Sequence, residues 1–154
     1  MNSDDRLALS DLVHRYAAGV DDRRFAEVAE LFAEDATLTV PDLPRTLEPD
    51  VVRRGRSEIE EAVAGIAQTE RTMHAIIGET YTAATQTGSA RGRVAGIAHH
   101  FTRHDGRVTD VAWYLRYDDE YVRTDAGWRF SSRALTVDAI ETRPVRRLRD
   151  RRES

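Results

Sequence analysis

The sequence predicts one α+β domain in which helices precede a sheet. Apolar residues recur at helical spacing through the first part of the chain, whereas the stretches from Thr72 onward are rich in Val, Ile, Thr, Tyr and Trp. The length of 154 residues suits a single domain with one core. This segregation is typical of helices packed on one face of a curved antiparallel sheet.

A first helix is expected near the N-terminus, where polar residues at 3–5 can cap it. Its apolar stripe consists of Leu9, Leu12, Val13, Tyr16, Ala17 and Val20. Gly19 weakens helical continuity near the end of this stripe, and an unbroken helix would place Tyr16 and Asp21 about 140° apart. We therefore expect these two side chains to share a pocket only if the helix ends or bends between them.

Two more helices and a short strand follow. The second helix is marked by Phe25, Val28, Ala29 and Phe32. A strand is expected at Ala36–Val40, and the proline-rich segment Pro41–Asp50 is expected to be a surface loop able to act as a lid. Ser57 and Glu60 form a capping box that predicts the start of the third helix. The buried face of that helix consists of Ile59, Val63, Ile66 and Ala67.

Four long strands make up the rest of the predicted domain. They are Thr72–Thr85, Ala90–Arg103, Arg107–Arg123 and Trp128–Ala139. Turn sequences around Gly88, Gly106 and Gly127 separate them, which predicts consecutive antiparallel hairpins. We place the domain at residues 1–143. Residues 144–154 hold five Arg against one Asp and one Glu, and we expect a disordered, solvated tail, with a docking arm for an acidic partner as the alternative.

Composition excludes several classes of function. A net charge of −4 argues against nucleic-acid binding. Cysteine is absent and every one of the 23 basic residues is arginine, which excludes thiol chemistry and Schiff-base lysines. No apolar run reaches the ~18 residues of a membrane span, and the N-terminus lacks the pattern of a signal peptide, so we expect a cytoplasmic protein that binds no membrane.

A metal site is not expected either. His100 and His104 have H-x3-H spacing, but on a strand this spacing separates two side chains by about 13 Å, too far for one ion. The chemistry that remains is acid–base catalysis by His, Asp, Glu and Tyr.

Several separated blocks of the chain together resemble the SnoaL-like branch of the NTF2-like superfamily. They are a Tyr-x4-Asp motif formed by Tyr16 and Asp21, the stretch LFAEDATLTV at 31–40, the mid-chain His74, and RYDDEYVRTDAGWRFSSR at 116–133. The resemblance spans about Asp5 to Ile140. It implies an NTF2-like cone, in which three N-terminal helices pack on a curved antiparallel β-sheet.

This branch is similar to scytalone dehydratase, bile-acid 7α-dehydratase, polyketide cyclases and hexachlorocyclohexane dehydrochlorinase. The resemblance therefore implies a cofactor-independent dehydratase, isomerase or cyclase that acts on a hydrophobic polycyclic or aromatic small molecule. It also implies a homodimer or homotrimer, because the open sheet of this superfamily is usually covered by another subunit.

Three residues match the catalytic positions of the family. Asp21 in GVDDRR corresponds to its catalytic aspartate, His74 in TMHAII to its catalytic histidine, and Tyr16 to a tyrosine of the bile-acid dehydratase pattern. A carboxylate that binds one ring nitrogen of histidine raises the basicity of the other. The resemblance thus implies His74 as general base, Asp21 as its orienting carboxylate and Tyr16 as acid or oxyanion donor. Asp22, adjacent to Asp21, is an alternative partner of His74, although its position favours a role as cap of the second helix.

Four further residues are expected to contact the substrate: His100, Arg133, Trp113 and Tyr117. His99 matches the second pocket histidine of the family as well as His100 does, and strand alternation allows only one of them to face the pocket. Arg133 stands near the sequence position of an arginine that can face the pocket in the family. Trp113 and Tyr117 could stack on a planar ligand, or cover the helices or a second subunit.

Other functions are compatible with the same residues. A histidine flanked by Met73 and Ile76 is often simply a packed residue, and the fold also hosts non-catalytic small-molecule-binding or assembly modules. In such a module, Asp21 and His74 would lie beyond hydrogen-bond reach, or side chains would fill the cone. An accessory subunit of a ring-hydroxylating dioxygenase is a third alternative.

Overall fold

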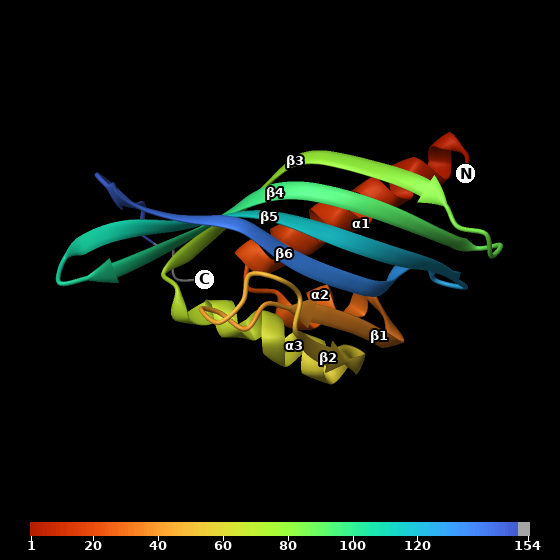
Figure 1. Cartoon of the computed structure of the whole chain (residues 1–154), viewed down its shortest axis with the longest axis horizontal. Helices are drawn as coiled ribbons and strands as arrows, with labels where there is room; N and C mark the ends of the chain where they lie inside the picture. Colours follow the sequence, from red (N-terminus) through yellow and green to blue (C-terminus); the bar gives the residue numbers. More distant parts are fainter. Residues whose placement is uncertain (151–154) are drawn as a thin grey trace.

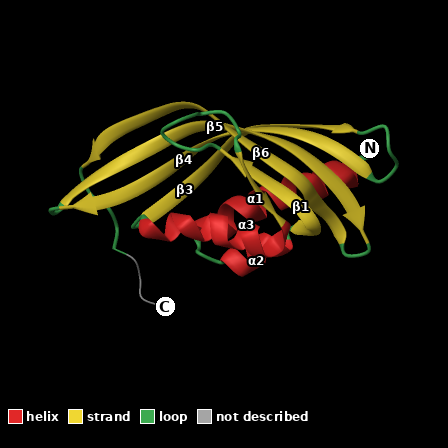
Figure 2. Ribbon diagram, turned by 60° about the horizontal axis from the view of Figure 1, so that its bottom comes forward, coloured by secondary structure: helices red, strands yellow, loops and turns green. Residues whose placement is uncertain are grey.

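The structure, a computed structural model, describes residues 1–150 and shows an α+β fold built on one six-stranded sheet (Figure 1). The elements are α1 (Ser3–Asp21), α2 (Phe25–Glu30), β1 (Phe32–Val40), β2 (Val51–Arg54), α3 (Gly55–Ala64), the 3-10 turn η1 (Gly65–Gln68), β3 (Arg71–Ala83), β4 (Ser89–His104), β5 (Arg107–Thr124) and β6 (Gly127–Val145). The strand order is β2-β1-β6-β5-β4-β3. All three helices lie on one side of the curved sheet (Figure 2).

Strands β3 to β6 form the predicted series of antiparallel hairpins. The β4–β5 turn illustrates why the local sequence determines them. Asp105 and Gly106 both have positive φ, as a two-residue hairpin turn requires, and His104 pairs directly with Arg107. Strand β6 continues through Val145, beyond the expected Ala139, because its last residues pair with the start of β5.

The sheet differs from the expected arrangement in three respects. Strand β1 begins at Phe32, a residue expected in the second helix, because α2 already ends at Glu30. The sheet is also not purely antiparallel, because β1 runs parallel to β6, with Leu38 opposite Arg133. These two strands are far apart in sequence, so no hairpin turn determines their relative direction. In addition, the chain forms a short edge strand, β2, after the proline-rich loop, where the sequence predicts none.

Helix α1 continues past Gly19. It is unbroken from Ser3 to Asp21, and Asn2 caps it by accepting a hydrogen bond from the Asp5 backbone at 2.8 Å. Gly19 is not a break: a Cβ there would lie 2.6 Å from Val28, so glycine lets α1 and α2 approach each other.

Helix α3 begins at Gly55, before the expected cap. Ser57 therefore lies inside the helix, and Glu58 rather than Glu60 accepts a hydrogen bond from the Arg54 backbone, at 2.8 Å.

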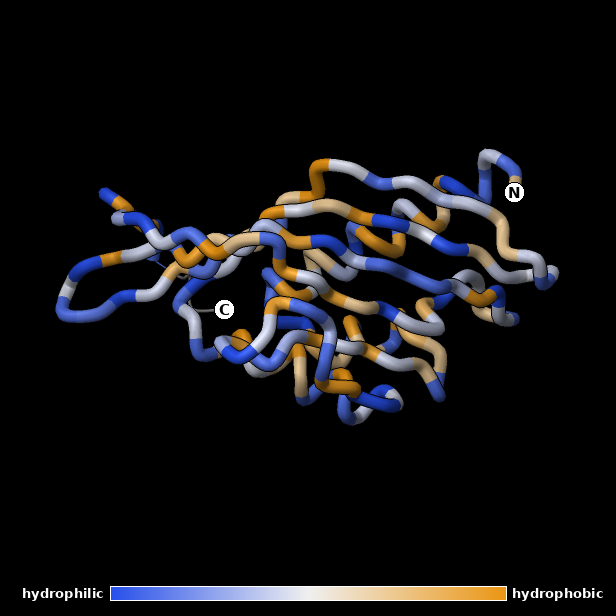
Figure 3. Tube along the Cα trace, in the orientation of Figure 1, coloured by the Kyte–Doolittle hydropathy of each residue, from blue (hydrophilic) through white to orange (hydrophobic). Residues whose placement is uncertain are grey.

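The core lies between α1 and the helix-covered face of the sheet. Fully buried side chains at its centre are Leu9, Val13, Phe32, Leu38, Val94 and Phe130. Hydrophilic residues gather at the β4–β5 turn (Figure 3). No helix within residues 1–150 is long and apolar enough to cross a membrane. Residues 151–154 of the predicted tail lie outside the described residues.

Candidate active site

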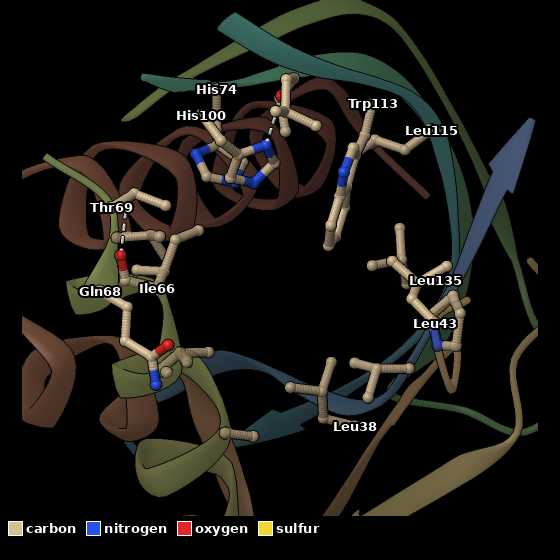
Figure 4. A pocket seen from close by; sticks show the side chains of 18 of the residues that line it. Leu38, Leu43, Ile66, Gln68, Thr69, His74, His100, Trp113, Leu115 and Leu135 are labelled. Carbon is tan, nitrogen blue, oxygen red and sulfur yellow. Dashed lines mark hydrogen bonds between the residues drawn. The ribbon is translucent and has the colours of Figure 1, made fainter. Parts of the chain in front are cut away.

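A cavity of about 470 Å³ opens between the sheet and the helices (Figure 4). The polar or aromatic side chains of its wall are Tyr16, Gln68, Thr69, His74, His100, Thr102, Trp113 and Tyr117. The rest of the wall is apolar and includes Leu38, Leu43, Ile66, Leu115 and Leu135. An apolar cavity with a few convergent polar groups is the usual form of a small-molecule site.

The structure brings Asp21 and His74 together at this wall. Asp21 is the last residue of α1, and α1 packs on β3, which carries His74. The Nδ1 atom of His74 lies 2.7 Å from Asp21 Oδ1, and the His74 backbone N–H donates to Asp21 Oδ2 at 2.9 Å. These two bonds fix the carboxylate relative to the imidazole ring. His74 lines the cavity, whereas Asp21 is not part of the wall.

Thr72 also binds the carboxylate, and Arg23 binds Thr72 in turn. The Thr72 hydroxyl donates to Asp21 Oδ1 at 3.0 Å and in turn accepts a hydrogen bond from Arg23 Nη1 at 3.1 Å. The Arg23 guanidinium also binds the backbone carbonyl and the hydroxyl of Thr69, at 3.1 and 3.0 Å. Asp21 is thereby tied to both β3 and the segment that follows η1.

Hydrogen bonding decides the charge of Asp21. Burial acts to raise its pKa, but the hydrogen bonds from the His74 ring, the His74 backbone and Thr72 outweigh burial, so the pKa of Asp21 lies below its usual value. A carboxylate can only accept a hydrogen bond, so the proton between the two residues belongs to Nδ1 of His74. In the neutral ring, Nε2 is then the nitrogen that carries a free electron pair.

Tyr16 and Tyr117 line the cavity as protonated phenols. Burial raises the pKa of Tyr16, and the positive charge of Arg133 only partly opposes this effect. Burial also raises the pKa of Tyr117. The two rings pack edge to face, with centroids 6.0 Å apart.

His100, not His99, lies at the cavity wall. Its Nδ1 atom lies 2.8 Å from the backbone carbonyl of Val111, which can only accept, so Nδ1 carries the proton. Burial lowers the pKa of His100 and favours the neutral ring. Its ring centroid lies 4.5 Å from that of Trp113, so the two predicted contact residues form one wall. The Nδ1 atom of His99 instead lies 2.7 Å from Asp110 Oδ2, and His99 is not part of the cavity wall.

Arg133 corrects a prediction, because it does not line the cavity. Its side chain is 1% exposed and donates to both carboxylate oxygens of Asp119, at 2.8 and 2.9 Å. The guanidinium carbon lies 4.3 Å from the ring centroid of Tyr16 and 4.0 Å from that of Tyr117. Arg133 therefore supports the two tyrosines and is too deeply buried to touch a substrate.

Several supporting residues escaped the sequence analysis. Thr72 stands two residues before His74, so strand alternation alone would have placed both side chains on one face. No comparable signal marks Arg23, whose contacts depend on how α1 ends. The expected loop contributes Pro41 and Leu43 to the wall, and its Leu47 carbonyl accepts a hydrogen bond from the Val137 backbone at 2.9 Å.

Solved structures share this fold. A protein from Novosphingobium aromaticivorans, provisionally named an aromatic ring hydroxylase, is 24% identical with a TM-score of 0.77, and the match covers 94% of this chain and 96% of that one. A provisional scytalone dehydratase from the same species is 21% identical with a TM-score of 0.74, covering 97% and 95%. The hexachlorocyclohexane dehydrochlorinase LinA-type3 from Novosphingobium barchaimii is 18% identical with a TM-score of 0.73, covering 96% and 94%.

Sequence comparison shows the family. No curated protein matches the chain significantly. The sequence profile of the SnoaL-like domain, however, matches residues 1–134. The chain therefore belongs to the SnoaL-like domain family of the NTF2-like superfamily.

Proposed function

We propose that the protein is a cofactor-independent acid–base enzyme that removes a proton from carbon in a hydrophobic cyclic or aromatic substrate. The observation that carries this proposal is the 2.7 Å contact between Asp21 and His74 at the wall of a mainly apolar cavity. Because Nδ1 of His74 is bound to a carboxylate, Nε2 is the basic atom available to a substrate.

Elimination is the reaction that these groups support best. Nε2 of His74 takes the proton from the carbon beside a carbonyl, and the electron pair of the broken C–H bond moves into the enolate. As the enolate collapses, a carbon–carbon double bond forms and the leaving group departs with its bonding electrons. Tyr16 donates a hydrogen bond to the oxygen on which charge develops, a role that suits a phenol held in its protonated form.

The names of two similar structures support this reaction class. A dehydratase and a dehydrochlorinase both eliminate a small molecule from carbon. The main alternative is a non-catalytic binding or assembly module. A binding module needs the cavity but not the hydrogen bond between Asp21 and His74, so it is this contact that favours the enzyme.

Proton exchange at carbon tests the proposal without knowledge of the natural leaving group. A panel of cyclic β-hydroxyketones is incubated with the protein in D2O, and NMR follows deuterium entry at the acidic carbon and formation of the unsaturated product. We expect His74→Ala and Asp21→Asn each to lower the rate at least a hundredfold. His104→Ala, at the exposed β4–β5 turn, is the matched control. A wild-type rate in His74→Ala would refute the role of the base.

A further inference from the structure

A second hollow, of about 940 Å³, lies at the end of the β4–β5 hairpin, beside the last residues of β6. We call it the arginine hollow after the side chains that line it, Arg103, Arg107, Arg143, Arg146, Arg147 and Arg149. Asp150 is the one acidic residue of this lining. The hollow is separate from the cavity that holds His74.

Positive charge is concentrated in this hollow. Its six arginines and Asp150 together carry +5, and the chain as a whole carries −4, so all other residues together carry −9. Arg103 pairs with Glu70 and Asp150, and Arg143 pairs with Asp110 and Glu141. The other four arginines form no ion pair within residues 1–150, and all four are exposed. Such a concentration of one sign of charge creates a positive local potential that attracts anions.

The arginine hollow adjoins the catalytic cavity. Thr102 lines the cavity and Thr109 lines the hollow, and their hydroxyls lie 3.0 Å apart. One step along the sheet, Val111 of the cavity wall pairs with Thr142 of the hollow. Two neighbouring strand pairs thus form the boundary, and a single molecule that crosses the threonine pair reaches both sites.

Guanidinium groups bind phosphate and carboxylate oxygens through paired hydrogen bonds. We propose that the arginine hollow binds an anionic group, phosphate or carboxylate, carried by the substrate whose apolar ring system occupies the cavity. This proposal rests on the proposed function for the identity of the cavity as the reaction site. It defines the substrate class as an amphipathic molecule with an apolar cyclic part and an anionic extension.

Direct anion binding is the first test. Inorganic pyrophosphate is titrated into the full chain at constant ionic strength, with heat or amide chemical shifts as the readout. We expect saturable binding, and the double variant Arg107→Glu/Arg147→Glu should weaken it about tenfold or more. Both residues are exposed, so the fold should survive. The double variant Arg15→Glu/Arg91→Glu makes the same charge change at exposed positions elsewhere and should bind as the wild type does.

A matched pair of ligands tests the link between the two sites. A naphthol ether bearing a hexanoate chain is compared with its neutral amide. We expect wild-type protein to bind the acid about tenfold more tightly, and Arg107→Glu/Arg147→Glu to remove this preference while leaving the affinity for the amide unchanged. Equal affinities in the wild type, or an equal loss in the Arg15→Glu/Arg91→Glu control, would overturn the proposal.

These binding measurements need no turnover. Absence of proton exchange would refute the proposed chemistry while the preference for the acid remained. Conversely, a catalytically competent protein with no preference for the acid would refute the anion subsite alone.

Discussion

Asp21 is ionised in a place where burial alone would favour its neutral form. Three donors, the His74 ring, the His74 backbone and the Thr72 hydroxyl, compensate for the loss of water around the carboxylate. In the proposed reaction, this negative charge orients His74 and stabilises the imidazolium that forms when His74 takes a proton. The three donors that keep Asp21 ionised would then serve the reaction as well as the fold.

The lowered pKa of Asp21 makes stability depend on pH. Because the folded-state pKa lies below the unfolded value of about 3.8, Asp21 contributes stability that is fully present above that value and is lost as pH falls through the folded pKa. Melting temperatures of wild type and Asp21→Asn between about pH 6 and pH 2 measure this effect. We expect a constant wild-type advantage above about pH 5 that shrinks below pH 4. Parallel curves over the whole range would contradict it.

Thr72 offers a milder test of the same carboxylate. Thr72→Val keeps the shape of the side chain but removes the hydroxyl that Asp21 and Arg23 share. We expect kcat/KM to fall roughly tenfold, because a hydrogen bond to a charged group is lost. Thr82→Val, at an exposed position of β3, serves as the control and should retain full activity. An unchanged pH–rate profile in Thr72→Val would show that the hydroxyl does not act through Asp21.

Contacts between helices and strands position the residues around the cavity. Asp119 of β5 pairs in register with Arg133 of β6, and the guanidinium packs on the ring of Tyr16 from α1. One buried ion pair thus joins two strands and a helix beneath the cavity. Gly19, two residues before Asp21, packs closely on Val28 of α2, and this contact positions the C-terminal end of α1.

We expect the Arg133–Asp119 ion pair to stabilise the fold without contacting a substrate. Arg133→Met leaves Asp119 buried without its cation and should destabilise the protein by about 3–5 kcal/mol. The double variant Arg133→Met/Asp119→Asn should lose less than this single variant, because the uncompensated charge is gone. Urea unfolding measures both. A fully stable Arg133→Met with impaired ligand binding would support the substrate contact that the structure contradicts.

At Gly19 we expect alanine to destabilise the protein, although alanine has the higher helix propensity. Alanine normally stabilises a helix interior by about 1 kcal/mol relative to glycine, but here its Cβ would collide with Val28, a buried and stiff side chain. We expect Gly19→Ala to lower the melting temperature and Gly19→Ala/Val28→Ala to show a favourable coupling energy. At Gly65 a Cβ would meet nothing within 4 Å, so Gly65→Ala should be neutral or stabilising.

The molecule as a whole is a curved sheet closed by helices around a hollow centre. Leu38 and Leu135 line the cavity from β1 and β6, and Ala98 and Trp113 line it from β4 and β5. The cavity that holds His74 therefore depends on the curvature of the entire sheet rather than on one element. The expected homodimer or homotrimer stays a prediction, which sedimentation at several protein concentrations tests.

Filling the cavity tests where an apolar ligand binds. Ala98→Phe places a ring in the space beside Trp113, so we expect the affinity for a naphthol ligand to fall more than tenfold. Ala98 is itself buried, so the larger side chain should also lower the melting temperature, and pyrophosphate binding serves as the check that the variant is folded. Pyrophosphate binding should be unaffected, because the lining of the arginine hollow includes neither Ala98 nor Trp113. Undiminished naphthol affinity would place the ligand outside the cavity.

Local sequence determined the order of the elements. Apolar spacing marked the helices, and turn residues such as Asp105 and Gly106 marked the hairpins, because both signals act between residues that are near neighbours along the chain. The candidate pair, Asp21 and His74, came from resemblance to a family and not from spacing, since 53 positions separate the two residues.

Tertiary structure decided which side chains reach the cavity. His100 rather than His99 faces it, Arg133 turns into the core toward Asp119, and β1 lies parallel to β6. Each of these outcomes depends on register and side-chain direction between segments that are distant in the sequence. A one-residue shift of a strand reverses every side chain on it, and no local pattern in this chain specifies the shift.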